Sequence, residues 1–506
     1  MNKAAGTVVA IVVVAGVAWA GTSWYTGTRV EAEIVKSIER ANAQMLEVAP
    51  EWGGKLSLAS FEKGVFSSNA RYLLTLPPMT PATAEPAAAA PGAPAPAAPA
   101  AAAGKPTEIV IADHIEHGPF PMSRIAHGGL TPVMATSNFE LERNASVEEW
   151  FKHTSGAVPL SGMASLGYGG AVDGKVNIAP VAYDTPTDGV TFSGLELNFD
   201  VNADRTVSKL DGDFDRLLFK TQNAEGTPTT FEAKTVVLNS DMRGMFIGQN
   251  EITAKSLTIT IPDSKVEIAD YAQRMDLKEA DNKVSGTLGY EVGQVRVNGA
   301  DLASGQFVLR VKDLDAAAIQ RMSELYRESA MRAAQSGNQA GAEPTPQEQQ
   351  AFMDAVMQSL AGNPTLQIDP LLIKTAKGEG RFTLKIDLKK PIDPAMTMDA
   401  IAAQMVNQMD ARLVVSKPML TDLLAFQATS AGAPADAAQK QAAQQTELVG
   451  AMGQQMGAVR VDGQNIVSTL SYSKGEIDFN GKKMPVGDFA GALLSMVLGG
   501  GMSLRP

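Results

Sequence analysis

The sequence predicts an α+β protein with an N-terminal transmembrane helix, a large and mainly antiparallel β region, and strand–helix units toward the C-terminus. Three observations carry this prediction. Residues 4–20 contain no charged side chain, hydrophobic residues alternate with polar ones over residues 108–312, and after residue 313 they recur at three- and four-residue spacing. Regular alternation of strands with helices, which is typical of a doubly wound parallel sheet, is absent.

The amino-acid composition limits the number of domains and the classes of function that the chain can have. The 506 residues correspond to about three domains of ordinary size. Lys and Arg number 43 against 55 Asp and Glu, giving a net charge of −12, which argues against general nucleic-acid binding. The chain has no cysteine and only four histidines. Disulfide frameworks, thiolate metal sites and cysteine nucleophiles are therefore excluded.

Residues 1–25 are predicted to form a transmembrane signal anchor. About 20 helical residues span the hydrocarbon layer of a bilayer, and Trp24 and Tyr25 lie where amphipathic rings favour its interface. The pattern at Ala18 to Ala20 also fits signal-peptide cleavage after Ala20, so both readings stay open. Retention is favoured because bulky neutral residues continue past Ala20. We expect a single-pass membrane protein, with the bulk of the chain outside the cytoplasm and the lipid bilayer as a partner.

Residues 26–76 are predicted to form a helix and a strand pair. Apolar residues at helical spacing indicate a helix over Glu31 to Leu46, and Leu56 to Leu76 reads as two strands around Gly64. Residues 77–106 are rich in alanine and proline. They cannot bury a core, and we expect a linker or a disordered insertion.

Residues 107–312 are predicted to form the antiparallel β region. Alternation is clear in Leu195 to Val201, Leu257 to Ile261, Val284 to Val292 and Phe307 to Val311. Such strands can close into a sandwich or barrel, or curl into an open half-pipe with an apolar concave face. The closed form is favoured because it removes more apolar area from water.

Residues 313–428 are predicted to be a mixed strand–helix region. Leu314 to Leu325, Phe352 to Leu360 and Met398 to Met409 show helical spacing, and Phe382 to Leu388 alternates as a strand. Three segments repeat a strand followed by a helix, which suggests a repeated unit: 305–322, 380–398 and 410–426.

Residues 429–446 are expected to be a low-complexity loop, and residues 447–506 a C-terminal β and helix segment. Strands are predicted at Ile466 to Leu470 and Ile477 to Phe479, on either side of Lys474-Gly475. Asn480-Gly481 is a hairpin turn signal.

Asp113-His114-Ile115-Glu116-His117 is the densest potential metal cluster. On a strand, however, its four candidate ligands divide between two faces. A purely structural role is favoured instead. In this alternative the segment is a strand that enters a tight turn, and His117 bonds the local backbone. His127 and His153 add no ligand spacing.

Three further patterns suggest chemistry and are better explained by structure. The segment from Gly169 to Val176 matches most of the P-loop motif, but a glycine-rich hairpin that turns at Asp173-Gly174 is favoured. Asp211, Asp213 and Asp215 resemble the start of a calcium loop and are expected to form a solvated strand face. Methionine pairs four residues apart could hold Cu(I), although core filling is more common; they are Met353/Met357, Met405/Met409 and Met452/Met456.

Short motifs along the whole chain resemble the YdgA family of proteobacterial envelope proteins. They include Trp24-Tyr25-Thr26-Gly27, Gly64 to Ser68, His117-Gly118-Pro119-Phe120-Pro121, Ala451 to Gln454 and Asn480 to Met484. The alanine- and proline-rich stretch departs from the family pattern as an insertion. The resemblance implies an inner-membrane anchor and a large periplasmic part, without an established activity. Trp24, Tyr25, Gly27, His117, Gly118 and Pro119 are family motif residues of unknown role.

We therefore expect a non-enzymatic binding or scaffold role in the cell envelope. The alternative is a lipid-binding or lipid-carrying protein with an apolar β groove. No catalytic residue, cofactor or metal ligand is assigned from the sequence. An envelope protein, a lipid or a second copy of the chain are the open partners, and nucleic acid is not one of them.

Overall fold

The computed structural model describes residues 38–39, 41–42, 45, 53–64, 66–77, 106–203, 207–223, 226–243, 247–335, 345–390, 404–486 and 488–489. The chain divides into two compact units. Unit 1 comprises Met1–Tyr183, Ser193–Val207 and Tyr326–Pro344, and unit 2 comprises Asp184–Phe192, Ser208–Leu325 and Thr345–Pro506. The predicted anchor, with Trp24, Tyr25 and Gly27, and most of the alanine- and proline-rich stretch lie outside the described residues. Within the described part of the chain, no helix has the length and apolar character needed to cross a membrane.

Unit 1 contains an antiparallel sheet in the strand order β1-β2-β3-β4-β5-β6-β9. Its elements are β1 (Lys55–Lys63), β2 (Ser67–Leu76), β3 (Thr107–His117), α3 (Met122–Ala126), β4 (Ala135–Glu142), α4 (Glu148–His153), β5 (Leu160–Leu166), β6 (Val172–Ile178), β7 (Val181–Asp184) and β9 (Leu195–Val201). The strand pair predicted around Gly64 is confirmed. The described residues of the predicted helix over 31–46 are helical.

The core of unit 1 follows from strand alternation. Alternate side chains of β2, β3 and β4 point inward, and many of them are at most 2% exposed: Tyr72, Leu74, Ile109, Ile111, Ile115, Phe139 and Leu141. The Asn42 amide fixes the preceding helix against β1 by bonding both backbone groups of Leu56, at 2.8 and 2.7 Å.

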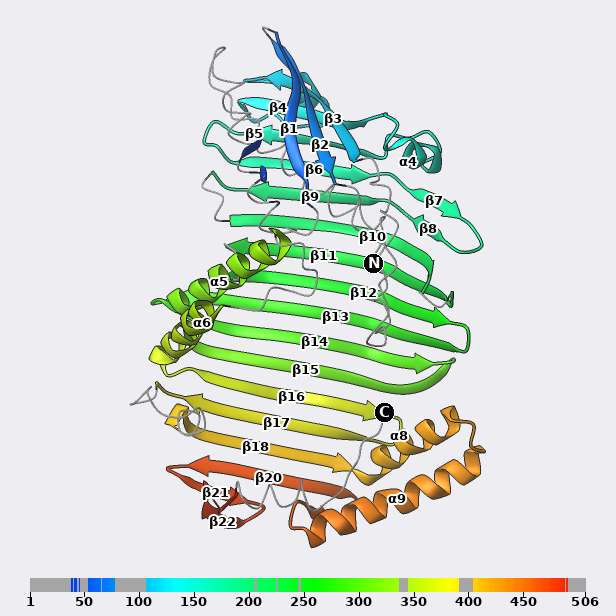
Figure 1. Cartoon of the computed structure of the whole chain (residues 1–506), viewed down its shortest axis with the longest axis vertical. Coiled ribbons are helices and arrows are strands. Elements are labelled where there is room, and N and C mark those ends of the chain that lie inside the picture. The colour runs from blue at the N-terminus through cyan, green and yellow to red at the C-terminus, as the bar shows by residue number, and fades with distance from the viewer. Residues whose placement is uncertain are drawn as a thin grey trace, which may run out of the picture. The chain divides into compact units, whose positions relative to one another are not determined.

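Unit 2 contains long strands, most of them joined by short hairpins (Figure 1). Its strands are β8 (Gly189–Phe192), β10 (Val207–Gln222), β11 (Pro228–Arg243), β12 (Ile247–Ile261), β13 (Ser264–Ala280), β14 (Lys283–Val297), β15 (Ala300–Asp315), β16 (Thr365–Thr375), β17 (Gly378–Leu388), β18 (Val406–Ser416), β19 (Arg460–Asp462), β20 (Asn465–Ser473), β21 (Glu476–Phe479) and β22 (Lys482–Pro485). Its helices are α5 (Ala316–Gln335, in this unit as far as Leu325), α6 (Pro346–Ser359), η2 (Leu360–Gly362), α8 (Lys417–Ser430) and α9 (Ala435–Gln455).

The ladders of unit 2 are antiparallel, and β11 to β18 pair in chain order, followed by β20. Short β19 and β21 pair with β20, and β22 with β21. The hairpin turns use residues that tolerate positive φ, such as Asn298-Gly299 (52° and 82°) and the predicted Asn480-Gly481 (54° and 86°). The antiparallel β region is therefore confirmed. Strand–helix units also occur, as β15 with α5 and β18 with α8.

Three local expectations are wrong. Residues 435–446 of the expected low-complexity loop belong to α9, because alanine and glutamine are good helix formers. Met409 of the expected third helix lies in β18, where its apolar neighbours alternate across the sheet. The glycine-rich hairpin turns at residues 167–171, while Asp173 and Gly174 pair within β6. No P-loop geometry results, because a strand and not a helix follows the glycines.

Candidate functional site

The family motif at the end of β3 forms a structural corner of unit 1. The Gly118 N–H donates to the Met134 carbonyl oxygen at 2.7 Å, and the Gly118-Pro119 peptide bond is cis. A Cβ atom at Gly118 would lie 1.8 Å from the Val133 carbonyl oxygen, so only glycine fits. His117 Nε2 lies 3.1 Å from Ser68 Oγ, while the His117 N–H bonds the Phe66 carbonyl. His117, Gly118 and Pro119 thus shape the chain at this corner.

The candidate metal cluster around His117 divides as the alternation predicts. His114 is exposed, with Nδ1 2.8 Å from Asn69 Oδ1, while Asp113 is buried on the other face of β3. Among the described residues, no three His, Asp or Glu side chains lie close enough to hold a metal ion.

Asp113 belongs to a buried polar cluster that the sequence did not indicate. Its carboxylate accepts hydrogen bonds from Ser137 Oγ at 2.6 Å and Tyr72 Oη at 3.3 Å. Burial raises the pKa of Asp113 to about 7, and these two hydrogen bonds offset part of that shift. The cluster lies within the apolar core beside Ile111 and Ile115, which gives it no visible route to a substrate.

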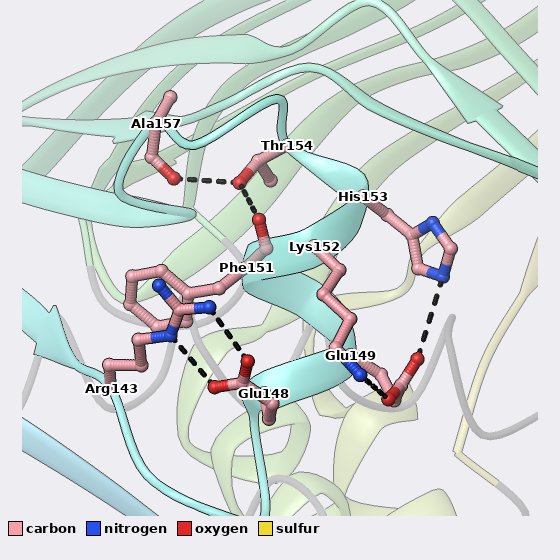
Figure 2. Close-up of polar contacts among 8 residues, drawn as sticks. All are labelled: Arg143, Glu148, Glu149, Phe151, Lys152, His153, Thr154 and Ala157. Atoms are coloured by element: carbon pink, nitrogen blue, oxygen red, sulfur yellow. Dashed lines mark hydrogen bonds and ion pairs between the residues drawn. The ribbon is translucent and has the colours of Figure 1, made fainter.

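His153 lies in a surface ion-pair cluster on and beside α4 (Figure 2). Arg143 makes a two-pronged contact with Glu148, both distances being 2.7 Å, and its guanidinium lies over the Phe151 ring. Lys152 and His153 both approach Glu149, at 2.6 and 3.9 Å. Each carboxylate here already has a cationic partner, so the cluster fits a solvated helix surface.

The aspartate series and the methionine pairs do not form ligand sites in the described residues. Asp211, Asp213 and Asp215 are exposed along β10, as predicted for a solvated strand face. Met452 on α9 is 52% exposed, and Met456, which directly follows the helix, is 43% exposed. Met405 and Met409 do not share a helix.

The most prominent surface feature is one face of the unit 2 sheet, which we call the apolar face. Paired residues of antiparallel strands point to the same side, so the ladders define rows across β11 to β18 and β20. Four alternate rows lie on one side. The rows contain Val236, Ala254, Tyr271, Val292, Gly305, Ile373, Gly380, Val415, Ile466; then Leu238, Ile252, Gln273, Tyr290, Phe307, Leu371, Phe382, Leu413, Ser468; then Ser240, Asn250, Met275, Leu288, Leu309, Ile368, Leu384, Ala411, Leu470; then Met242, Gly248, Leu277, Gly286, Val311, Leu366, Ile386, Met409, Tyr472.

These four rows hold no charged side chain and are largely uncovered. Leu371, Ile373, Leu413 and Tyr290 are 41, 43, 38 and 36% exposed, and most other members are half-buried. Eight strand spacings of about 4.8 Å give a length of roughly 38 Å across the strands. No second sheet packs on this face among the described residues, which corrects the expectation of a closed sandwich for this unit. Exposed apolar surface of this extent is uncommon in monomeric proteins and is typical of interaction sites.

Helices stand at the ends of the strands and leave the middle open (Figure 1). α8 contacts β16, β17 and β18, and a Cβ atom at Gly380 would lie 3.0 Å from the Met419 methyl group. Gly380 therefore lets α8 approach one end of the apolar face. α6 and η2 contact β15 near the opposite strand ends.

The apolar face becomes polar at one end. Beyond an irregularity in the ladders at Lys255, Asp270 and Val295, β12 and β14 continue with the polar residues Ser256, Thr258, Gln294 and Arg296. Arg296 bonds Glu267 and Asp301, each at 2.9 Å. The face thus joins a wide apolar area to a charged border.

The opposite face of the sheet is polar and rich in ion pairs. Arg274 reaches Glu251 at 2.7 Å and Glu291 at 3.3 Å across neighbouring strands. A hollow of about 680 Å³ lies on this side over β16 to β21, lined by residues that include Arg381, Arg412 and Arg460. Sequence alternation indicated that each strand has two kinds of face, but cross-strand rows need the register and could not be seen.

Comparisons with known proteins give a family without an established role. A family model described as "Bacterial protein of unknown function (DUF945)" matches residues 1–487. Protein YdgA of Escherichia coli K12 is 27% identical and covers 97% of this chain and 96% of its own length. The uncharacterized protein YihF of the same organism is 24% identical, covering 96% of this chain and 98% of its own length. No solved structure matches the chain.

Proposed function

From the premise that this chain belongs to the DUF945 family of bacterial proteins of unknown function, we propose that it is a non-enzymatic protein that binds a long-chain amphiphile on the apolar face of unit 2. The single observation that carries the proposal is the set of four uncharged rows, which α8 and α9 approach only at one end and whose middle no described element covers. This favours the lipid-binding alternative over a purely structural scaffold.

The chemistry of the face supports an acyl chain as its occupant. The interior strands already use their backbone groups in ladders on both sides, so an added peptide strand has no free edge to pair with there. Aliphatic side chains and the aromatic rings of Tyr290, Phe307 and Phe382 suit an unbranched hydrocarbon. The charged border at Arg296 suits a polar headgroup at the end of the chain.

The free energy that an acyl chain would gain on the apolar face can be estimated from the area it buries. A fully buried CH₂ group gains about 0.8 kcal/mol, and a chain lying on an open face buries roughly one side. A chain of about sixteen carbons would then gain about 6 kcal/mol before the entropic cost of binding. Much of this gain is offset by the cost of association, which favours reversible capture of the chain over permanent binding. The predicted N-terminal anchor would hold the protein near a membrane in the periplasm.

The test is native mass spectrometry of the full-length protein released in detergent, with lipid extraction of the same sample. We expect stoichiometric co-purifying lipid that a mock preparation lacks. The double variant Leu371→Glu, Ile373→Glu introduces two carboxylates on the apolar face and should abolish this lipid. The matched control, Thr287→Glu with Gln306→Glu, adds the same charge to the opposite face of the sheet and should retain it. Lipid-free wild-type protein, or equal binding by both variants, would contradict the proposal.

A second candidate function, docking of an envelope protein, rests on a different observation. α9 packs through its small residues Ala438, Ala442 and Gly450, whereas Leu448 and Val449 on the same helix are 58 and 51% exposed. In the same native mass spectrum, a lipid-free protein carrying a second chain would favour docking. Lipid bound to a single chain would favour the amphiphile proposal.

A further inference from the structure

Three arginines line the hollow on the polar side of the unit 2 sheet. Three successive rows on this side meet there. One row runs Arg381, Val414, Val467, Arg460, the next holds Thr383, Arg412, Thr469, and the third runs Gln367, Lys385, Asp410, Ser471, Asp478. Arg412 therefore lies one same-side row from the line that joins Arg381 and Arg460.

The three arginines surround small side chains. Arg381 and Arg460 are separated by two strands, or about 14 Å between backbones, and two valines lie between them. The Arg381 guanidinium is held by Asp369 of β16, at 2.7 Å. Arg412 and Arg460 both line the hollow, and the small side chains between the strands leave space for a ligand beside them.

Arg412 and Arg460 lack a carboxylate partner, whereas most other arginines in the described part of the chain have one. Arg274 and Arg296 each contact two carboxylates, and Arg381 bonds Asp369 at 2.7 Å. Within the described ranges, neither Arg412 nor Arg460 has a carboxylate oxygen within 4.0 Å.

The aspartates of the hollow are already engaged. Asp410 accepts from Gln408 Nε2 at 2.9 Å, and Asp478 accepts from the Gly481 N–H at 2.8 Å. The hollow thus offers free cationic donors next to hydroxyl groups from Thr383, Thr469 and Ser471.

We propose that this hollow binds a phosphate ester, held by Arg412 and Arg460. Guanidinium groups bind phosphate oxygens in two-pronged geometry, and the neighbouring hydroxyls can bond the organic part of the ester. The site lies on the opposite side of the sheet from the apolar face, so it goes beyond the amphiphile proposal. The phosphate can come from a soluble ester or from a phospholipid headgroup at a bilayer surface.

The test titrates the full-length protein with glycerol 3-phosphate by calorimetry, and in parallel with vesicles of phosphatidylglycerol or phosphatidylcholine. We expect saturable binding to glycerol 3-phosphate, or to phosphatidylglycerol vesicles if the bilayer supplies the ligand. Arg412→Gln with Arg460→Gln should weaken whichever binding occurs by about tenfold or more. Arg243→Gln, which removes an exposed arginine of β11 outside the hollow, should leave it within about twofold.

A conservative pair guards against misfolding of the neutral variant. Arg412→Lys with Arg460→Lys keeps the charge and loses the two-pronged geometry, and we expect an intermediate loss of about threefold or more. No saturable binding of either probe, or an equal loss with Arg243→Gln, would overturn the proposal. Retained lipid in the glutamine variant would show that the amphiphile site stands independently.

Discussion

Units 1 and 2 are built from the same kind of antiparallel strand, yet they bury their side chains very differently. In unit 1, Leu74, Ile109 and Ile111 are fully buried, and β4 is buried on both sides at Thr136 and Ser137. In unit 2, the equally apolar Leu371, Ile373 and Leu413 remain more than a third exposed. A run of alternating residues therefore specifies a strand and its two faces without specifying what covers them.

The difference suggests that the two units serve different purposes. Unit 1 gains stability from a closed core, whereas unit 2 keeps apolar area in contact with water that a sandwich would have removed. Such area is retained where a partner or ligand completes it. The predictions below test this contrast from its largest expected effect to its smallest.

The largest change in the free energy of unfolding should come from replacing an aromatic core side chain of unit 1 with alanine. Phe139→Ala is expected to destabilise the protein by about 3–5 kcal/mol, because the ring is 2% exposed and leaves a cavity. Leu371→Ala in unit 2 should cost less than about 1 kcal/mol, since its side chain is already 41% exposed. Urea unfolding followed by circular dichroism measures both. Equal costs would break the comparison and show that Leu371 is packed in solution.

The next effect concerns pH and the buried Asp113. Its folded-state pKa is raised to about 7 from 3.8, so the folded protein holds this proton more tightly than the unfolded chain. The resulting stability is fully present below pH 4 and is lost as pH rises to about 7. At about 1.36 kcal/mol per pKa unit, the loss is about 4 kcal/mol.

Asp113→Asn should remove this component of the pH dependence, because the amide does not titrate. The measurement is urea unfolding between about pH 4 and pH 8, followed by tryptophan fluorescence, since Trp150 lies on α4 in unit 1. Asp263→Asn, at an exposed turn position of unit 2, is the control for the loss of one carboxylate. Parallel pH profiles for wild type and Asp113→Asn would contradict this assignment.

The smallest effect should come from the ion pairs on the polar side of unit 2. Arg274→Gln removes contacts to Glu251 and Glu291, all on exposed side chains, and should cost under about 1 kcal/mol. The cost should shrink further at about 1 M salt, where the screening length is about 3 Å. Unfolding at low and high salt checks this. A large and salt-independent cost would mean that the polar side carries the packing of this unit.

Much of the fold could be predicted from residue patterns. Period-two runs such as Leu195 to Val201 and Phe382 to Leu388 are strands, and the turn at Asn480-Gly481 is where its positive-φ preference places it. Errors arose where local signals conflicted. Asp173-Gly174 reads as a turn, but pairing across β5 and β9 keeps both residues in a strand.

The candidate sites were harder to predict than the strands. Each row of the apolar face takes one residue from each of nine strands, so no local segment shows its continuity. Arg412 and Arg460 are 48 positions apart in sequence and meet only through β20. Asp113 looked like part of a histidine cluster, whereas its partners Tyr72 and Ser137 come from the two neighbouring strands.

Photo-crosslinking with a diazirine-bearing fatty acid, followed by peptide mapping of the full-length protein, tests the central claim most directly. The account predicts adducts concentrated on apolar-face residues of β14 to β18, such as Tyr290, Leu371 and Leu413, and competition by unlabelled fatty acid. Adducts confined to α9 or unit 1, or scattered adducts that unlabelled fatty acid does not suppress, would contradict it.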